Sequence, residues 1–442
     1  MNFQLPYNNP VESDHIALYK NARIIDPKSN LDIVGDLVTK GDKVFQVVEG
    51  GIQEQNITPN EIIDCSGLLI TPGLIDIQVH FRDPGQTHKE DMISGSKSAV
   101  AGGVTTVVCQ PNTNPVLDST LTFDYLRLKA KEQAYCNVLA YGAISKSMKG
   151  EELTDMESLK NAGAVGFTDD GLPVMNANLM RKAFEYSKGL GVVLAQHAED
   201  LDLSNKGCIN EGEVSVELGV RGIPNISESV IVQRDIAILE AVGGRYHLLH
   251  ASTKEAVEAI RQAKSKNLSV TCEACPHHFL LTDKQVLKSG TNAKMNPPLR
   301  SEEDRQAVLN GLIDGTIDTI STDHAPHDIE SKNKTIQDAA FGIVGVETML
   351  PLSLKLYHEG LINLNDLIAK MTCNSAKVIN FDGGNLSIGA RADLTIIDLD
   401  RKWKINTQNF HSKSKNSPFD GFEVKGKAVM TVIAGKIVYQ EA

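Results

Sequence analysis

The chain has 442 residues, of which 41% are hydrophobic, and a formal net charge of −12 at pH 7. This charge argues against a nucleic acid or an anionic membrane as a partner, so an anionic substrate would need a local basic group. The first residues, MNFQLPYNNPVESDH, are polar, and no window approaches the ~18 continuous apolar residues of a membrane span. Seven cysteines without regular spacing favour a reducing compartment over a disulfide framework. Composition therefore predicts a soluble cytoplasmic protein.

The two ends of the chain share one pattern. After a loose N-terminal arm at 1–15, short strands and turns run from 16 to about 70, and the same pattern returns at 381–442. Gly, Asn and Asp separate these strands, as turn residues do. We expect the two segments to pair into one small composite β domain, on the basis of this similarity alone.

The middle of the chain, 71–380, alternates apolar strands with helix-like segments. Eight strands are predicted, at 74–80, 104–109, 136–142, 164–168, 192–197, 246–250, 269–274 and 317–322. Helices are predicted between them, for example at 120–134, 177–189, 228–242 and 254–266. Eight alternating units indicate an α/β fold of the (β/α)8 TIM-barrel type. The polar stretch 328–334 is predicted to be an exposed loop.

Side chains that bind metals follow five of these strands, at the end where barrel active sites lie. They are His80, Asp170, His197, His250 and Asp323. Neutral imidazole and carboxylate suit zinc, which lowers the pKa of bound water to about 7. One barrel histidine alone is more often structural, but five such residues at strand ends favour a metal centre.

Other polar residues at the strand ends suggest further roles. We expect Asp323 to move a proton between water and a leaving nitrogen, and the less favoured alternative is that it only caps the loop that follows. Arg82, two residues beyond His80, could grip a carboxylate with two hydrogen bonds. Asn112, Asn296 and His327 follow strands 2, 7 and 8, although asparagine beside proline is also typical of turns.

A C-x-x-C spacing occurs at Cys272 and Cys275. No second pair accompanies it and the segment has the pattern of a buried strand, so we interpret it as structural and not as a zinc or redox motif. His277 and His278, which follow, are interpreted as structural or supporting residues and not as ligands.

Nine segments together are similar to one family. They are GLIDIQVHFRDPGQTHKED, QPNTNPV, GFTDDGLPV, AQHAED, HLLHASTKE, PHHFLLTD, KMNPPLR, STDHAPH and FGIVGVET. From about residue 15 onward the chain resembles the dihydroorotases of the bacterial type I branch, within the amidohydrolase superfamily. Sister enzymes such as dihydropyrimidinase and allantoinase usually carry a carboxylated lysine after strand 4. Here Asp169-Asp170-Gly171 stands there, which favours the dihydroorotase branch.

The resemblance implies a set of roles. The metal ligands would be His80, Asp170, His197, His250 and Asp323. Asp170 would be able to bridge two metals, and Asp323 would also be the catalytic acid and base. The substrate would be bound by His80, Arg82, Asn112, Asn296, His327 and the backbone at Phe341 and Gly342. The reaction would interconvert dihydroorotate and N-carbamoyl-L-aspartate in pyrimidine synthesis.

One residue departs from the family pattern, because Gln78 stands where a histidine is usual. Glutamine is a much poorer zinc ligand, so we expect one zinc and doubt a second. Two other functions remain open: a sister activity such as dihydropyrimidinase, or a catalytically silent relative that supports aspartate transcarbamoylase. A silent relative should lose several ligands together, whereas only position 78 departs here. We therefore favour an enzyme, and the partners to expect are further copies of the chain in a homo-oligomer and aspartate transcarbamoylase.

Overall fold

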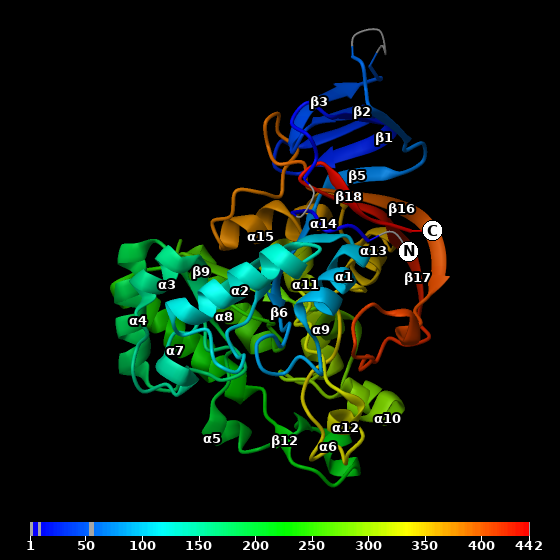
Figure 1. Cartoon of the computed structure of the whole chain (residues 1–442). Coiled ribbons are helices and arrows are strands. Elements are labelled where there is room, and N and C mark those ends of the chain that lie inside the picture. Colours follow the sequence, from blue (N-terminus) through cyan, green and yellow to red (C-terminus); the bar gives the residue numbers. More distant parts are fainter. Residues whose placement is uncertain (1–2, 8–9, 53–56, 442) are drawn as a thin grey trace.

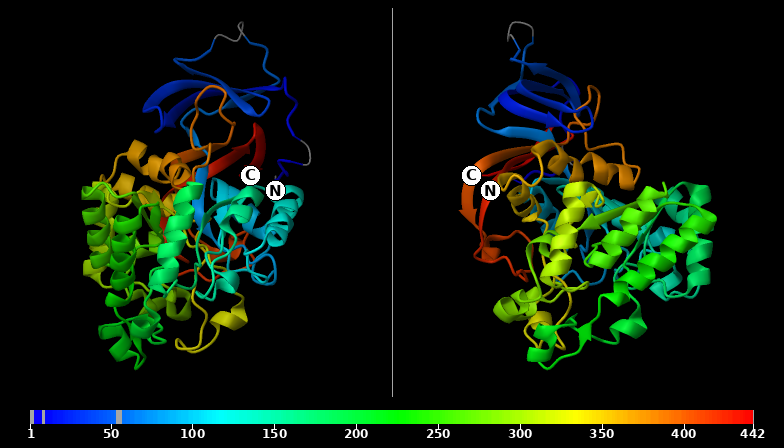
Figure 2. Two further views of the ribbon diagram at one scale, coloured as in Figure 1. Left: turned by 90° about the vertical axis from the view of Figure 1, so that its left-hand side faces the viewer. Right: turned by 180° about the vertical axis from the view of Figure 1, so that it is seen from behind.

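The computed structural model describes residues 3–7, 10–52 and 57–441. A barrel of strands and helices lies against a mixed β sheet to which both ends of the chain contribute (Figure 1). Figure 2 shows the barrel from two further sides, with helices on its outside and the mixed sheet at one end. No helix in the described ranges is long and apolar enough to cross a membrane.

The barrel has eight strands in the order β15-β14-β13-β10-β9-β8-β7-β6, and neighbouring strands run parallel. Their bounds are β6 (Leu74–Val79), β7 (Val104–Cys109), β8 (Asn137–Gly142), β9 (Ala164–Phe167), β10 (Val193–Gln196), β13 (Tyr246–Leu248), β14 (Val270–Ala274) and β15 (Thr319–Ile320). A parallel bridge between Val79 and His324 joins the first strand to the segment after the last. The predicted (β/α)8 barrel is therefore confirmed.

Helices cover the outside of the barrel. They are α1 (Met92–Ala101), α2 (Thr120–Gln133), α3 (Met156–Ala162), α4 (Ala177–Leu190), α7 (Ile226–Val242), α8 (Lys254–Ser265), α11 (Glu302–Asp314) and α13 (Met349–His358). In α8, Val257 and Ile260 are buried on one face, and the Thr253 side chain accepts a hydrogen bond from the Ala256 amide at the helix start. An apolar stripe and an N-terminal cap of this kind position a helix against a strand layer.

Shorter elements extend from the carboxyl ends of the strands. They are η2 (Lys146–Met148), α5 (Leu201–Ser204), β11 (Ile209–Asn210), α6 (Glu213–Glu217), β12 (Gly222–Ile223), α9 (Pro276–Leu280), α10 (Gln285–Ser289), η3 (Gly290–Ala293) and α12 (Ile329–Lys332). In Figure 1, α5, α6, α10, α12 and β12 lie at the end of the barrel away from the mixed sheet. The loop predicted at 328–334 is wrong in part, because α12 forms there and buries Lys332. Its ammonium group is satisfied by three backbone carbonyls, at Lys294, Ala340 and Gly342.

The mixed sheet has the order β18-β17-β16-β5-β1-β2-β3, with β4 paired to β1. Its strands are β1 (Ile16–Asp26), β2 (Leu31–Lys40), β3 (Lys43–Glu49), β4 (Glu61–Asp64), β5 (Leu69–Pro72), β16 (Leu394–Lys404), β17 (Glu423–Ile433) and β18 (Lys436–Gln440). The helices α14 (Leu364–Lys370) and α15 (Cys373–Val378) lead from the barrel to it, and η4 (Thr407–Asn409) follows β16. In β5, Ile70 pairs with Ile24 on one side and with Ile396 on the other. The expected sheet from both chain ends is thus present, while the boundaries proposed between the two domains stay a prediction.

The N-terminal arm at 1–15 is described only in part, because residues 1–2 and 8–9 lie outside the described ranges. Within the described part, the Phe3 ring meets the Tyr135 ring edge-on with centroids 5.6 Å apart. The Gln4 amide donates to the Val438 carbonyl at 3.0 Å. These contacts tie the start of the chain to both the barrel and the last strand of the sheet.

Candidate metal centre

Five acidic and imidazole side chains converge at the carboxyl ends of the barrel strands. They form two groups, His80–Asp170–Asp323 and Asp170–His197–His250, and within each group the ligand atoms lie within 4.8 Å of one another. All five side chains are buried, and Asp170 belongs to both groups. The structure therefore brings together every side chain predicted to bind metal, although their role as ligands stays a prediction.

The His80 ring is held in an orientation that suits a ligand. Its Nδ1 lies 2.9 Å from Oδ1 of Asn112, and its Nε2 lies 3.0 Å from Oδ1 of Asp323 and 3.3 Å from Oδ2 of Asp170. An amide oxygen only accepts hydrogen bonds, so Nδ1 carries a hydrogen and donates it. In the neutral ring, Nε2 then faces two carboxylates with a lone pair. A cation, either a proton or a metal ion, is needed between them.

The His197 ring is also held through one nitrogen while the other faces the cluster, but here Nε2 is the anchored one. Its Nε2 lies 3.1 Å from Oε2 of Glu199, and its Nδ1 lies 3.0 Å from Nε2 of His250. The Nδ1 atom also lies 3.5 Å from Oδ1 of Asp170. A carboxylate that accepts from one ring nitrogen while the other faces the ligand cluster is the arrangement found around metal-bound histidines. The donor set therefore fits a metal ion.

The electrostatics of the cluster also favour a cation. Burial lowers the pKa of His80 and His197, but Asp170 and the neighbouring carboxylates more than offset this and raise the values to about 9 and about 10. Burial raises the pKa of Asp170, yet its three histidine contacts hold it well below its ordinary value. Without a metal the cluster thus binds protons. A metal ion would have to displace them, so its affinity depends on pH.

Gln78 lies inside this cluster and not at its rim. It is fully buried in β6, on the same strand face as His80, and its Nε2 donates to Oδ2 of Asp170 at 3.3 Å. Its Oε1 has no hydrogen-bond partner among the described residues. The amide therefore competes for an oxygen of the carboxylate that both groups share, while offering zinc a poor ligand itself.

Arg82 and His327 form a basic corner beside the cluster. The Nη2 atom of Arg82 lies 3.3 Å from Nε2 of His327, and its Nε donates to the Pro326 carbonyl. Burial lowers the pKa of Arg82 to about 10, and burial together with Arg82 lowers that of His327 to about 2, so His327 is neutral and accepts. In the part of the chain that the structure describes, Arg82 forms no ion pair. This half-buried guanidinium is thus available to an anionic ligand.

The remaining predicted contacts surround the same space. Asn112 touches His80, and Nδ2 of Asn296 donates to Oε2 of Glu199 at 2.8 Å. Gly342 has φ +130°, and a Cβ there would lie 2.7 Å from Cβ of Ala325 and 3.2 Å from Cδ2 of His327. The segment at Phe341–Gly342 therefore packs directly on His327, and only glycine fits at the second position.

Three residues of the site have an unusual backbone. Arg82, His250 and Asp323 have φ values of 56°, 32° and 50°, in the left-handed region that residues with a Cβ seldom adopt. Each follows a barrel strand within three residues, where the chain turns sharply into the loop. Such conformations cost about 1–3 kcal/mol each and cluster at functional sites. They turn these side chains toward the mouth of the barrel.

Two residues of the site were not assigned a role from the sequence. Glu199 fixes His197 and binds Asn296, and its pKa is lowered to about 2 because His197 outweighs the effect of burial. The sequence could have indicated this role, since Glu199 stands two residues after His197 at the end of a strand. Lys332 holds the Gly342 carbonyl at 3.0 Å. It had no signal, because it belongs to a polar stretch typical of exposed loops.

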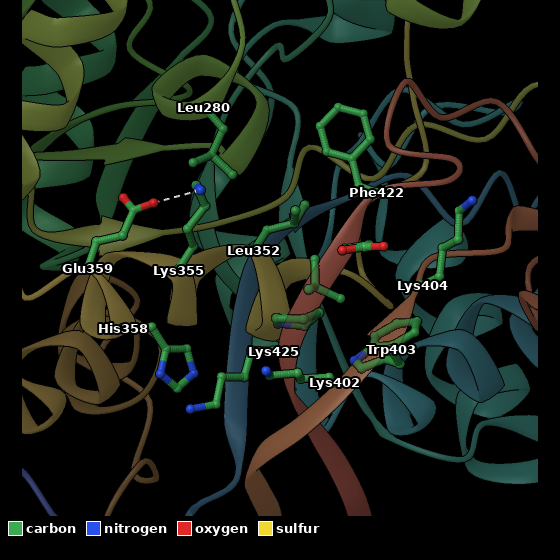
Figure 3. Close-up of a pocket in the computed structure, with 13 residues that line it drawn as sticks. Leu280, Leu352, Lys355, His358, Glu359, Lys402, Trp403, Lys404, Phe422 and Lys425 are labelled. Atoms are coloured by element: carbon green, nitrogen blue, oxygen red, sulfur yellow. Dashed lines mark ion pairs between the residues drawn. The ribbon is translucent and has the colours of Figure 1, made fainter.

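A separate groove of about 920 Å³ lies between the barrel and the mixed sheet (Figure 3). Trp403 and Lys402 line it from β16, and Lys355 pairs with Glu359 across its wall at 2.6 Å. None of the residues that line this groove belongs to the metal cluster or to the basic corner. The chemistry inferred for the strand ends therefore does not extend to it.

The barrel and its buried histidine–aspartate cluster define the class of the protein as an amidohydrolase. The sequence profile described as "Amidohydrolase family" matches residues 311–439, and the one described as "Dihydro-orotase-like" matches residues 67–256. The chain is 53% identical to a dihydroorotase of Ehrlichia chaffeensis, over 98% of this chain and 97% of the relative. It is 48% identical to a dihydroorotase of Geobacter sp. (strain M21), over 96% and 99%. The chain belongs to the dihydroorotase family.

Solved structures show the same fold. The L-hydantoinase (dihydropyrimidinase) from Arthrobacter aurescens has a TM-score of 0.87 and 27% identity, covering 98% of this chain and 97% of that one. The dihydropyrimidinase from Brevibacillus agri has a TM-score of 0.84 and 21% identity, covering 96% and 95%. The second comparison supports the fold alone.

Proposed function

We propose that the chain interconverts dihydroorotate and N-carbamoyl-L-aspartate in de novo pyrimidine biosynthesis. Relatives about half identical to it over nearly their whole length are named dihydroorotase. The observation that carries the proposal is the half-buried guanidinium of Arg82 beside the metal cluster, which forms no ion pair with any described residue. A substrate carboxylate is the partner that such a group lacks, and dihydroorotate has one where dihydrouracil has none.

Zinc is the metal that we propose for the cluster, because its donors are imidazole nitrogens and carboxylate oxygens. Asp170, His197 and His250 would hold it. When bound, the ion would polarise the scissile carbonyl and make water a stronger nucleophile near neutral pH. Gln78 weakens the part of the cluster around His80. We therefore propose one zinc per chain at the strand ends, held by Asp170, His197 and His250.

Asp323 would move the proton. In the hydrolytic direction, the attacking water forms the new C–O bond and the ring C–N bond breaks. Asp323 accepts the proton from the water and delivers it to the departing ring nitrogen. Its position supports this role, because Oδ1 lies 3.0 Å from Nε2 of His80 at the mouth of the barrel.

The substrate would be held by the groups around that position. Arg82 would bind the carboxylate with two hydrogen bonds, and the neutral His327 beside it would keep the guanidinium oriented. Asn112 and Asn296 would bind the polar ring edges, with the backbone at Phe341 and Gly342 closing the site. His80 would contact both substrate and metal.

A substrate comparison tests the proposal. We expect the purified zinc-loaded protein to hydrolyse dihydroorotate and to hydrolyse dihydrouracil and hydantoin poorly, because these two lack the carboxylate. Efficient hydrolysis of dihydrouracil would instead assign the chain to the dihydropyrimidinases. The solved hydantoinases with the same fold make this the competing activity to measure.

A catalytically silent role beside aspartate transcarbamoylase is the second alternative. The convergence of all five predicted ligands supports an enzyme, since a silent chain has no need to keep them together. Assembly with aspartate transcarbamoylase, a homo-oligomeric state and a cytoplasmic location remain part of the proposal. All seven cysteines are free, which is consistent with a reducing compartment. Absence of metal and of activity, alone and with aspartate transcarbamoylase added, would favour the silent role.

A further inference from the structure

A second cluster of ligand-type side chains lies where β14 leads into α9. Cys275, His277 and His278 are 0%, 1% and 3% exposed. One ligand atom from each lies within 4.8 Å of the other two. None of the three belongs to the strand-end cluster described above, and the sequence pattern had suggested only a structural role for them.

The His278 ring leaves one nitrogen bare. Its Nε2 lies 3.0 Å from the Pro297 carbonyl oxygen, which can only accept, so Nε2 carries the hydrogen. Burial lowers the pKa of His278 to about 3, so the ring is neutral. Its Nδ1 then presents a lone pair, yet it is buried with no hydrogen-bond partner among the described residues. A ring nitrogen fixed by a backbone carbonyl on its far side is the usual setting of a metal-binding imidazole.

The other two members also have side-chain atoms without a hydrogen-bond or disulfide partner among the described residues. Nε2 of His277 is buried with no hydrogen-bond partner in the described ranges, and burial lowers the pKa of His277 well below its ordinary value. Its ring lies against that of His278, with centroids 4.2 Å apart. The Cys275 thiol is free, whereas the Cys272 thiol donates to the Glu273 carbonyl. Two neutral imidazoles and a thiol therefore meet in the interior without hydrogen bonds between them.

We propose that Cys275, His277 and His278 form an additional site for a thiophilic divalent ion of the zinc type, separate from the strand-end cluster. Three atoms within 4.8 Å of one another all lie within about 2.8 Å of a common point. Zinc needs about 2.3 Å to sulfur and about 2.0–2.1 Å to nitrogen, so shifts below ~1 Å complete the site. A thiolate with two imidazoles is a donor set that zinc and cobalt accept.

Ion binding at this site releases a proton. Burial raises the pKa of the Cys275 thiol well above its ordinary value, so the sulfur is protonated while the site is empty. On binding, the S–H bond breaks, the proton passes to solvent and the metal–sulfur bond forms.

Cobalt substitution tests this inference apart from the proposed activity. The strand-end cluster contains no cysteine, so a thiolate-to-cobalt charge-transfer band in the near ultraviolet reports only on cysteine ligation. We expect the band in the cobalt-loaded wild type and its loss in Cys275→Ser. It should persist in Cys272→Ser, a matched buried cysteine, and in Asp170→Asn, which disables the strand-end cluster. Persistence in Asp170→Asn separates this site from the proposed catalysis.

Zinc-edge X-ray absorption of the zinc-loaded wild type gives a second measurement that needs no variant. We expect a sulfur neighbour at about 2.3 Å from part of the zinc. Absence of both the sulfur neighbour and the cobalt band at saturating metal would overturn the site. A band that survives Cys275→Ser would also overturn it, because the thiolate would then come from another cysteine such as the partly exposed Cys373. If Cys275→Ser fails to fold, the X-ray absorption result alone decides.

Discussion

Asp170 links the parts of the strand-end site, because its two carboxylate oxygens face different neighbours. Oδ1 faces His197 and His250, whereas Oδ2 faces His80 and Gln78. Any change at one side of this carboxylate is therefore transmitted to the other. The first three predictions concern single residues around it.

The first prediction concerns Asp323. Asp323→Asn keeps the shape of the side chain but cannot accept a proton, so turnover of dihydroorotate should fall by ~10²-fold or more. Asp318→Asn is the matched control, because Asp318 pairs with Lys264 near the start of the same strand. Steady-state kinetics with circular dichroism for folding checks this. Turnover near that of wild type in Asp323→Asn would remove its role as acid and base.

The second prediction concerns Arg82. Arg82→Met removes the charge-assisted hydrogen bonds proposed to hold the substrate carboxylate, so kcat/KM for dihydroorotate should fall about 10- to 100-fold or more. Activity on dihydrouracil should change much less, because it has no carboxylate to lose. Parallel assays on the two substrates measure the ratio. Equal losses on both would show that Arg82 does not recognise the carboxylate.

The third prediction concerns Gln78. Gln78→His would place two imidazoles on one face of β6, which is the arrangement that a second metal needs beside Asp170. We expect the variant to bind more zinc than wild type, or to bind it more tightly, as measured by metal analysis after dialysis. Comparing the two proteins removes the contribution of any other site. An unchanged zinc content and affinity would mean that Gln78 does not limit metal binding.

At the residue scale, the sequence predicted which side chains meet but not how they are held. His80, His197 and the aspartates follow predicted strands, and a barrel brings the ends of its strands to one mouth, so we could predict that these side chains meet. The left-handed backbone at Arg82 and Asp323 has no sequence signal, since neither is a glycine. The orientation of each imidazole also depends on partners such as Glu199, which only the folded chain brings near.

At the scale of elements, α12 and the segment after it form the wall of the site beside His327. Nζ of Lys332 donates to the carbonyls of Lys294, Ala340 and Gly342 at 3.1, 2.9 and 3.0 Å. One buried ammonium thus fixes the segment at Phe341–Gly342. The sequence predicted no role for it, because a run of charged and polar residues usually faces solvent.

The fourth prediction tests this wall. Lys332→Met removes three hydrogen bonds and leaves buried carbonyls unsatisfied, so the segment should loosen. We expect KM for dihydroorotate to rise several-fold, with a smaller change in kcat, because Lys332 positions the backbone and touches no reacting atom. Lys334→Met, two residues on and exposed, is the control. Matching KM values in the two variants would show that the wall does not depend on Lys332.

At the scale of the whole molecule, the metal cluster joins strands from around the barrel. The seam between its first and last strands is completed by the bridge between Val79 and His324. His80 and Asp323, the neighbours of those two residues, face one another in the cluster. The zinc proposed for Asp170, His197 and His250 would link the ends of β9, β10 and β13, and Oδ2 of Asp170 joins it to this pair through His80.

The fifth prediction follows from that link. Removing zinc with a chelator should lower Tm, because an ion that binds only the folded chain stabilises it in proportion to the logarithm of its concentration over Kd. The metal-free pKa values of His80 and His197 are about 9 and about 10, so below these values protons must leave before the ion binds. The Tm difference between loaded and stripped protein should therefore grow from pH 6 to pH 9. Scanning calorimetry measures it, and a constant difference would contradict proton competition at the cluster.

The overall architecture could be predicted from the sequence because it follows from the regular alternation of apolar strands and helix-like segments. Alternating apolar runs predicted each barrel strand to within a few residues. The prediction of the composite sheet rested only on the similarity between the two ends of the chain. Its register, such as Ile70 opposite Ile396, could not be predicted, because pairings between distant segments depend on the whole fold.

The central position of β5 also sets an order of events during synthesis. Leu69 pairs with Ile397, which leaves the ribosome more than 300 residues later. At about 5–20 residues per second, the free edge of β5 waits roughly a quarter of a minute to a minute for β16. During that time the whole barrel is made, while a row of unpaired backbone amides and carbonyls stays open to other chains. The nascent protein is thus most prone to aggregation just before its last strands emerge.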